Sequence, residues 1–341
     1  MKRLAVLLLL ILIVVAAAGA WLYVGVDRPY KGYGESEQFL EIPLGSGPGS
    51  IGRRLADAGV VRDRASFRLA VWLTGKGRRL QAGEYRFDRP LSAREVVDKL
   101  ARGEVYVRPI TFPEGLTIKQ MAALYENKGF GAADSFIKAA HDAALINGLD
   151  PQAADLEGYL FPDTYSLPRK ATAAQLVARM VGAFEKALSP EIRQQAASRG
   201  LGVRQLVTLA SIVEKETAHA EERPLVAAVY SNRLKIGMGL QCDPTVIYAL
   251  DRLGRYNGNL TRADLQLDSP YNTYRYAGLP PGPIASPGRA SLAAAASPAD
   301  VSYLYFVSRN DGSHAFASTL DEHNRNVQEY QVKYFRQLRG R

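Results

Sequence analysis

Two glutamates near the end of one predicted helix are the residues best placed for acid–base chemistry. Residues 206–217 read LVTLASIVEKET, and a helix of this sequence gathers its apolar side chains into one arc that faces a core. Glu216 falls inside that arc, Glu214 falls near its opposite rim, and Lys215 points away. Burial of a carboxyl group on an apolar stripe raises its pKa, because the charged form is disfavoured. A protonated carboxyl in a cleft is the general acid that glycosidic bond cleavage requires, although EKE also suits a solvated helix end.

Polar and aromatic residues follow this helix on predicted loops. Residues 237–248 predict a turn that leads into a helix, and residues 269–274 and 277–284 predict loops rich in Gly, Pro and Tyr. Flat rings beside amides and carboxylates suit sugars, which stack their C–H faces on aromatic rings and form hydrogen bonds through their hydroxyls. Turn-forming residues with tyrosines that fill gaps would give the same pattern. The residues with this chemistry are Gln241, Asp243, Thr245, Tyr248, Tyr271, Asn272 and Tyr274.

The elements that must position these residues are mostly helices. Residues 117–198 contain Ala-rich amphipathic stretches, and residues 201–235 predict two further helices. Within the first range, the segment LEGYLFPDTY at residues 156–165 contains Pro162, which excludes a regular helix there. This segment adds Glu157 and Asp163 as further carboxylates. The nearly unbroken apolar run at residues 301–307 predicts a buried strand.

A smaller unit precedes the helical part. Ser50 is predicted to cap its first helix, which Gly59 ends, and Ser92 with Glu95 has the spacing of a capping box. The predicted order is strand, helix, helix, strand, helix, strand, beginning at residue 39 and ending at residue 112. We interpret it as a small α+β module, whose opening segment resembles a LysM-type sugar-binding module.

The N-terminus predicts a membrane anchor. Residues 4–26 form an uncharged apolar run, which as a helix is long enough to span a hydrocarbon core of about 30 Å. Lys2 and Arg3 precede it, so the positive-inside rule leaves them in the cytoplasm and exports the body. Residues 27–38 are polar and read as a linker. A cleaved signal peptide is the alternative, since the alanines at 16–18 would suit a cleavage site, but the apolar run continues past them.

Composition limits the function classes. A chain of 341 residues, 47% hydrophobic and 23% charged, has room for two or three domains and is neither disordered nor a multi-span channel. Cys242 is the only cysteine, and the four histidines lack tight ligand spacing, so we expect no disulfide, metal or other cofactor. The net charge of +9 favours an anionic partner. Outside the cytosol that partner is membrane lipid or cell-wall polymer rather than nucleic acid.

Several long motifs carry a family resemblance. The segments LEGYLFPDTY, ASIVEKETAHAEERPLVAAVYSNRLKIGMGLQCDPTVIY, SPYNTY and GLPPGPIASPG resemble the YceG-like family of endolytic peptidoglycan lytic transglycosylases. The resemblance implies an α+β chain with a cytoplasmic end (1–3), a transmembrane helix (4–26), a linker (27–38), a LysM-like module (39–112) and a catalytic domain (113–341). That last domain would be mixed α/β with a helical core like that of lytic transglycosylases. Cys242 stands where relatives are expected to carry Thr.

The resemblance also implies a reaction. Glu216 matches the family's catalytic acid, and the enzyme would cleave the MurNAc–GlcNAc β-1,4 bond without water, forming a 1,6-anhydroMurNAc end and terminating glycan elongation. Glu214 stays the rival acid, with Glu157 next. A hydrolytic muramidase and a non-catalytic wall-binding scaffold remain alternatives, and peptidoglycan synthases would be partners. The expected substrate contacts are Glu157, Gln241, Asp243, Thr245, Tyr248, Tyr271, Asn272 and Tyr274.

Overall fold

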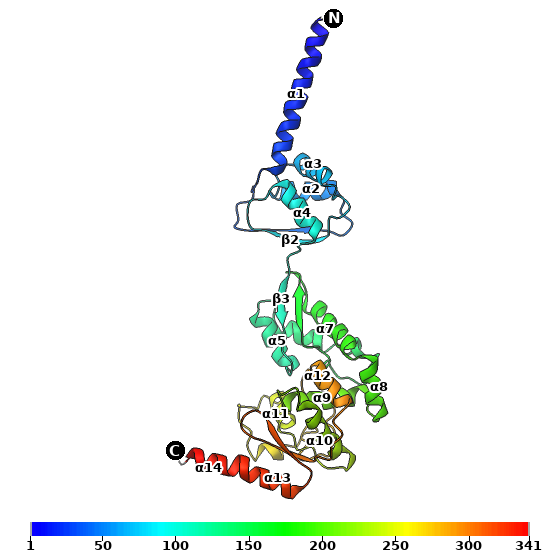
Figure 1. The fold of residues 1–341 in the computed structure, drawn as a ribbon, viewed down its shortest axis with the longest axis vertical. Coiled ribbons are helices and arrows are strands. Elements are labelled where there is room, and N and C mark those ends of the chain that lie inside the picture. Colours follow the sequence, from blue (N-terminus) through cyan, green and yellow to red (C-terminus); the bar gives the residue numbers. More distant parts are fainter. Residues whose placement is uncertain (1, 340–341) are drawn as a thin grey trace. The chain divides into compact units, whose positions relative to one another are not determined.

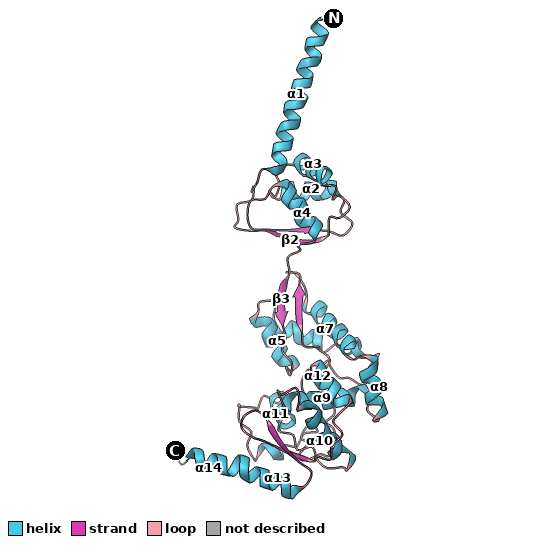
Figure 2. Ribbon diagram, viewed as in Figure 1, coloured by secondary structure: helices cyan, strands magenta, loops and turns pink. Residues whose placement is uncertain are grey.

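The computed structural model describes residues 2–339 as a mixed α+β chain with two compact units. The N-terminal unit comprises the residues up to Arg108 together with Ser166–Lys170, and the C-terminal unit comprises Pro109–Tyr165 and the residues from Ala171 onward. Helices dominate both units (Figure 2). Within residues 2–339 the strands form three two-stranded sheets.

The N-terminal unit is a small three-helix module that follows a long helix (Figure 1). Strands β1 and β2 are antiparallel, and their register pairs Gln38 with Phe87 and Ile42 with Gly83. The elements are α1 (Lys2–Asp27), β1 (Gln38–Ile42), α2 (Pro48–Asp57), α3 (Arg64–Thr74), β2 (Gly83–Phe87) and α4 (Ala93–Arg102).

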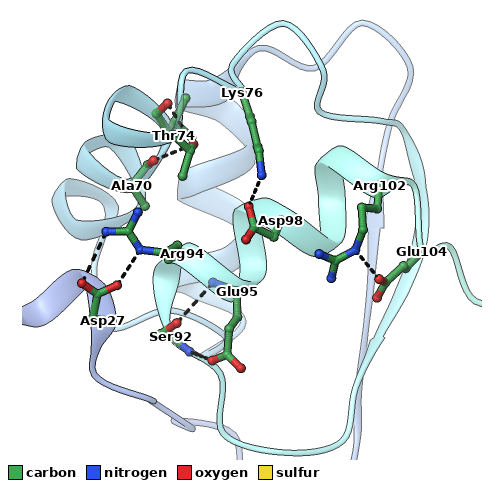
Figure 3. Close-up of polar contacts among 11 residues, drawn as sticks. Asp27, Ala70, Thr74, Lys76, Ser92, Arg94, Glu95, Asp98, Arg102 and Glu104 are labelled. Atoms are coloured by element: carbon green, nitrogen blue, oxygen red, sulfur yellow. Dashed lines mark hydrogen bonds and ion pairs between the residues drawn. The ribbon is translucent and has the colours of Figure 1, made fainter.

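The core of this unit forms where the apolar faces of α2, α3 and α4 meet the strands. Leu55, Phe67, Tyr85 and Leu100 are fully buried there, and Val26 at the end of α1 joins the same cluster. Asp27 pairs with Arg94 on α4 at 2.6 Å (Figure 3). The last turn of α1 is therefore part of the folded module.

Two predicted features of the module are confirmed, and one cap is wrong. Ser92 and Glu95 form the predicted capping box at the start of α4 (Figure 3), and Gly59 has a positive φ of 68° just after α2. Ser50 does not cap α2, which begins at Pro48 with Gly47 as its N-cap. Proline at the first helical position has a preset φ and needs no N–H partner there, so the helix starts three residues earlier than predicted.

The third strand predicted for the module does not pair within it. The strand predicted to end the module at residue 112 is β3 (Arg108–Thr111), which pairs with β4 (Thr164–Leu167) instead of with β1 or β2. Phe112 N–H donates to the carbonyl of Asp163 at 3.0 Å beside this pair. The first stretch of the compact N-terminal unit closes at Arg108, and Ser166–Lys170 also belongs to this unit.

Helix α1 has the length and composition of a membrane span. Over Leu8–Asp27 its mean hydropathy is 2.5, and nearly all of this stretch lies outside the protein interior. Its length and composition are compatible with a single-pass membrane anchor.

The C-terminal unit is built around α9. Residues 206–213 of this helix are all buried, and α9 packs against α8, α10, α11 and α12. The two helices predicted for 201–235 are confirmed as α9 and α10. The elements are α5 (Ile118–Asn127), α6 (Ala133–Ala140), η1 (Ala143–Ile146), β4, α7 (Ala173–Ala187), α8 (Pro190–Ser198), α9 (Val203–Glu216), α10 (Arg223–Lys235), α11 (Asp243–Arg252), η2 (Asp264–Gln266), α12 (Arg289–Ala296), β5 (Tyr305–Ser308), β6 (His314–Ala317), α13 (Leu320–Val327), η3 (Gln328–Lys333) and α14 (Tyr334–Arg339).

The strand predicted at 301–307 is wrong in extent and burial. Strand β5 begins at Tyr305 and all four of its residues are only partly buried. It pairs with β6 alone in a hairpin, in the register Tyr305–Ala317 to Ser308–His314. A two-stranded ribbon cannot cover both faces of a strand, so an apolar run alone overstates burial here.

Candidate active site

Glu216 is the last residue of α9, and its carboxyl group is held by two donors. The Tyr230 hydroxyl, from α10, donates to Oε1 at 2.7 Å, and the Cys242 thiol, just before α11, donates to the same oxygen at 3.0 Å. The side chain is partly buried. No ion pair within 4.0 Å involves Glu216 in the described part of the chain. The carboxyl therefore has two neutral donors on one oxygen and no cation within ion-pair distance in this part of the chain.

Burial sets the electrostatics of Glu216. Loss of water raises the pKa of this carboxyl, and the nearby negative charge of Asp243 raises it further. The hydrogen bonds from Cys242 and Tyr230 and the charge of His314 act in the opposite direction without cancelling the effect of burial. Burial also raises the pKa values of Tyr230 and Cys242, so both stay protonated as donors.

The loop before α11 places Cys242 through backbone contacts. Gln241 has a left-handed φ of 52°, and its N–H donates to the carbonyl of Thr273. The N–H of Cys242 donates to Thr273 Oγ1 at 3.0 Å, and Thr245 Oγ1 lies 2.9 Å from the same atom. Gln241 is exposed and Thr245 is fully buried. Thr245 thus shapes the loop from inside, whereas only Gln241 presents its side chain to solvent.

Asn272 organises the neighbouring loop. Its amide donates to the carbonyls of Leu265 and Leu267 at 3.0 and 2.8 Å, and its side-chain oxygen accepts from Tyr274 N–H at 3.0 Å. With no exposed surface, its amide group is fully used within the loop. Asn272 is therefore a buried loop-forming residue that fixes Tyr274.

Asp243 and Tyr274 form a polar pair near Glu216. The Tyr274 hydroxyl donates to Asp243 Oδ1 at 2.6 Å. Asp243, at the start of α11, is exposed, and Tyr274 is partly buried. Both interact electrostatically with Glu216, since the charge of Asp243 raises the pKa of Glu216 and the charge of Glu216 raises that of Tyr274. Among the residues predicted to contact substrate, Asp243 and Tyr274 are thus the accessible pair that interacts with Glu216.

Glu214, two residues earlier on α9, has different partners. Its Oε1 lies 3.4 Å from the Arg223 guanidinium, and its Oε2 accepts from Gly288 N–H at 2.9 Å. Gly288 is the N-cap residue of α12, where a negative charge is favoured by the helix dipole. The carboxylate therefore joins α9, α10 and the start of α12.

Glu157 belongs to a second cluster at the start of α5. Its carboxylate accepts from Ile118 N–H at 3.1 and 3.3 Å and from the Tyr248 hydroxyl at 3.3 Å. Burial, helped by the charge of Asp155, raises its pKa to about 8. Glu157 and Tyr248 line a cavity of about 350 Å³. Glu157 is separate from the Tyr230–Glu216–Cys242 contacts.

Tyr271 and Arg252 complete this second cluster. The rings of Tyr248 and Tyr271 lie 5.0 Å apart, and the Arg252 guanidinium sits 5.5 Å from the Tyr271 ring centroid. Asp163, the remaining carboxylate of the irregular segment, is exposed and accepts from Thr164 N–H. The predicted residues thus divide between two places, with Asp243 and Tyr274 near Glu216 and with Tyr248 and Tyr271 near Glu157.

Sequence reasoning missed Tyr230 and did not assign Cys242 a contact. It also missed His314 on β6, whose Nδ1 lies 2.7 Å from Glu222 Oε2, while Thr217 Oγ1 donates to the same oxygen at 3.2 Å. Tyr230 lies two turns into α10 in a buried apolar stretch, where periodicity predicts only core packing. Among residues 2–339 no group of His, Cys, Asp and Glu side chains has the geometry to hold a metal ion.

Glu216 and its neighbours combine two features. One carboxyl group is kept towards its neutral form by burial, and an exposed carboxylate–tyrosine pair lies beside it on a polar loop. A carboxyl group in such surroundings has the chemistry that a general acid–base site requires, and it lies in a mixed α+β protein that carries an apolar N-terminal helix.

Residues 40–329 match the sequence pattern of the YceG-like family, and the chain belongs to that family. It is 31% identical over 328 residues to the endolytic murein transglycosylase of Bacillus subtilis (strain 168), covering 92% of this chain and 90% of that protein. It is 32% identical over 321 residues to the endolytic murein transglycosylase of Streptococcus pneumoniae serotype 2, covering 85% of this chain but only 57% of the longer relative.

The fold is similar to a solved structure from the same family. A 2.6 Å crystal structure of a yceG-like protein from Listeria monocytogenes superposes with a TM-score of 0.57 at 32% identity. The match covers 85% of this chain and 98% of that one. The likeness therefore includes both compact units of the fold.

Proposed function

We propose that this chain is an endolytic murein transglycosylase, a lyase that cleaves glycan strands of peptidoglycan at the MurNAc–GlcNAc β-1,4 bond. Two curated relatives that match most of this chain carry that name. The observation that carries the proposal is the carboxyl group of Glu216, which is partly buried, has no ion pair within 4.0 Å among the described residues, and is held on one oxygen by Tyr230 and Cys242. Such a group is a neutral acid at a pH where an exposed glutamate is charged.

In the first step Glu216 acts as the acid. Oε1 is occupied by two donors, so Oε2 is the oxygen that carries the proton. Glu216 donates this proton to the oxygen that links MurNAc C1 to GlcNAc, and GlcNAc leaves with a hydroxyl group. The 2-acetamido oxygen of MurNAc closes on C1 as the bond breaks, so no second carboxylate is needed as nucleophile.

In the second step the ionised Glu216 acts as the base. It takes the proton of the MurNAc C6 hydroxyl, whose oxygen attacks C1 and displaces the acetamido oxygen. The product is a 1,6-anhydroMurNAc end, and Glu216 regains its proton. Water is not consumed. Tyr230 and Cys242 stabilise the charged intermediate form, because hydrogen bonds to a carboxylate are stronger than those to a neutral acid.

The remaining predicted residues receive different roles in this proposal. Asp243 and Tyr274 orient the sugar at the cleaved bond, with Gln241 beside them on the accessible loop. Thr245 and Asn272 hold the two loops in shape. Glu157, Tyr248 and Tyr271 bind a more distant part of the strand in their own cavity. Glu214 supports α9 through Arg223 and Gly288.

Helix α1 and the two compact units each have a separate role in this proposal. Helix α1 anchors the protein in the plasma membrane with its N-terminus in the cytoplasm, and both units lie on the opposite side. The N-terminal unit is a LysM-like module that holds glycan near the membrane, and the C-terminal unit resembles the helical core of lytic transglycosylases. Cleavage of nascent strands beside their synthases would terminate elongation.

Product analysis tests the proposal. Purified glycan strands are incubated with the full chain in detergent, and the new ends are identified by mass spectrometry. We expect 1,6-anhydro ends, which are lighter than reducing ends by one water. Reducing ends would identify a hydrolytic muramidase, and the absence of cleavage together with strand binding would identify a scaffold. Either result would overturn the proposed function.

A further inference from the structure

The part of the chain that contains most of α2, all of α3 and the residues just after α3 is strongly basic. Residues 51–80 contain eight Lys and Arg side chains against two Asp, so this short stretch carries six of the nine net positive charges of the chain. It also contains Trp72, one of only two tryptophans. The catalytic proposal uses none of these residues, and they lie in the unit that folds onto the end of α1.

The C-terminal turn of α1 packs into the rest of this unit. Val26 is fully buried in the module core, and Asp27 pairs with Arg94 on α4 (Figure 3). Gly25 lies against α3, where an added Cβ would come 3.5 Å from Ser66 Oγ. Helix α3 therefore starts beside the last turns of α1, and its solvent-facing side lies close to where an α1 span would leave the membrane.

The outer face of α3 carries exposed arginines and an exposed tryptophan along its length. Ser66, Phe67 and Ala70 face the module core and are buried. Arg64, Arg68 and Trp72 follow each other at intervals of four residues, so they share the opposite face of the helix, and all three are exposed. The Trp72 side chain is 77% exposed, which is costly for a large apolar ring in water.

Trp21 connects this face to the apolar helix. It lies in the last third of α1, is 61% exposed, and lines an open hollow together with Arg62, Arg64 and Asp57. Tryptophan near the end of a span marks the headgroup level of a membrane. Arg62 and Arg64 therefore lie at the depth at which lipid phosphates would be found.

The nearby acidic groups do not neutralise the arginines. Asp63 caps α3, accepting from Ser66 N–H at 2.8 Å, and Asp57 lies 3.5 Å from Arg64 in an exposed pair. Exposed pairs of this kind contribute little and exchange readily with other anions. Within residues 2–339, no ion pair within 4.0 Å involves Arg62 or Arg68.

We propose that Arg62, Arg64, Arg68 and Trp72 form a lipid-binding face that docks the N-terminal unit onto anionic phospholipid headgroups around α1. The inference rests on α1 as a membrane anchor, but its test does not depend on cleavage of glycan. The arginines bind lipid phosphates, and the Trp72 ring enters the interface between headgroups and acyl chains. These contacts add to the attachment through α1 and keep the outer face of α3 against the headgroups.

The test uses the full chain with Trp21→Phe, which leaves Trp72 as the only tryptophan. It is reconstituted in nanodiscs of phosphatidylglycerol or of phosphatidylcholine, and Trp72 emission and quenching by acrylamide are measured. We expect blue-shifted emission and protection from acrylamide in phosphatidylglycerol, both lost at high salt. When Arg62→Gln, Arg64→Gln and Arg68→Gln are introduced into this variant, the blue shift and the protection from acrylamide should both be lost. Each arginine strengthens lipid binding about fivefold, so the three together strengthen it by on the order of 100-fold.

A matched control keeps the net charge of that variant. Arg193→Gln, Arg199→Gln and Arg262→Gln remove three exposed arginines from the C-terminal unit and should leave Trp72 protected in phosphatidylglycerol. Circular dichroism in detergent verifies that each variant is folded. Equal protection in both lipids, or full exposure of Trp72 in both, would overturn the proposal. Protection that appears only when a soluble anionic wall polymer is added would assign the face to that polymer and overturn the lipid assignment.

Discussion

The last turn of α9 carries two glutamates in opposite environments. Glu214 meets a cation and a helix N-terminus, through Arg223 and Gly288 N–H, whereas Glu216 meets two neutral donors on a single oxygen. The first environment ties α9 to α10 and to the start of α12, and burial in the second raises the pKa of Glu216. Two residues of the same type, two positions apart along the helix, thus have entirely different partners, and our proposal assigns a structural role to Glu214 and the catalytic role to Glu216.

Replacement of Glu216 gives the largest expected effect. Glu216→Gln keeps the volume and removes the ionisable proton, so no cavity opens and the fold should survive. General acid–base catalysis contributes about 10²–10⁴-fold, and one group serves both steps here, so we expect a loss towards the upper end. The assay is formation of 1,6-anhydro ends, with circular dichroism as the control for folding. If Glu216→Gln kept near-normal turnover and Glu214→Gln were inactive, Glu214 would be the acid. If both variants stayed active, Glu157 would be the next candidate.

Glu157 should make the free energy of unfolding depend on pH. Its pKa is about 8 in the folded protein against an ordinary value of 4.5, so between these pH values only the unfolded chain has lost the proton. The free energy of unfolding should therefore fall as pH rises through this window, by about 1.4 kcal/mol per pH unit from this group. Glu157→Gln removes that part of the slope.

Chemical denaturation of the wild type and Glu157→Gln at pH 5, 6, 7 and 8 measures the difference. The two curves of unfolding free energy against pH should diverge, with the wild type steeper. Parallel curves would mean that Glu157 is charged in the folded protein, and the second carboxyl cluster would then be an ordinary ionic one.

Glu214 should affect stability more than turnover. Glu214→Gln leaves Arg223 without its closest anionic partner and weakens the contact to Gly288, which we expect to lower the free energy of unfolding by about 1–3 kcal/mol. Turnover per folded molecule should stay close to wild type. A urea titration and the anhydro-end assay, carried out on the same preparation, separate the two effects. Loss of turnover without loss of stability would contradict the structural role.

Tyr230 gives the smallest and most specific effect. Its hydrogen bond lowers the pKa of Glu216, so Tyr230→Phe should raise that pKa. Glu216 must be protonated at the start, and activity falls as pH rises through its pKa, so the falling limb of the pH–rate profile should move to higher pH. We expect turnover to drop by up to about tenfold.

Tyr165→Phe is the matched control for Tyr230→Phe. Tyr165 is a buried tyrosine of the same unit whose hydroxyl donates to a backbone carbonyl, that of Phe161, at 2.7 Å. Its loss should change stability without moving the pH profile. An identical profile shift in both variants would show that Tyr230 acts through general loosening of the fold.

Sequence alone could predict the part of this comparison that depends on helical periodicity. Helical periodicity places Glu216 inside the apolar arc of residues 206–217 and Glu214 near its opposite rim, but it does not decide which of the two is the acid. The structure gives them different partners. The same reasoning predicted the capping box of Ser92 and Glu95, because that contact spans only three residues. Local patterns of this kind need no knowledge of the tertiary fold.

The partners of Glu216 could not be predicted, because they come from distant elements. Tyr230 and Cys242 follow Glu216 by 14 and 26 residues, and only the packing of α10 and the start of α11 against α9 brings them to one oxygen. The predicted sugar contacts also divided between two clusters, since Tyr248 lies five residues along α11 from Asp243 and points to Glu157. Burial of the 301–307 segment failed for a related reason, as only pairing partners decide how far a strand is covered.

The protonation of Glu216 tests the central claim most directly. Infrared difference spectra of the chain labelled with ¹³C-glutamate, recorded for wild type, Glu216→Gln and Glu214→Gln across a pH titration, isolate the C=O band of each protonated carboxyl. The account predicts a band, absent only from Glu216→Gln, that titrates above the ordinary glutamate value of 4.5. A Glu216 band that disappears at or below that value would show a charged carboxylate and would contradict its role as the acid.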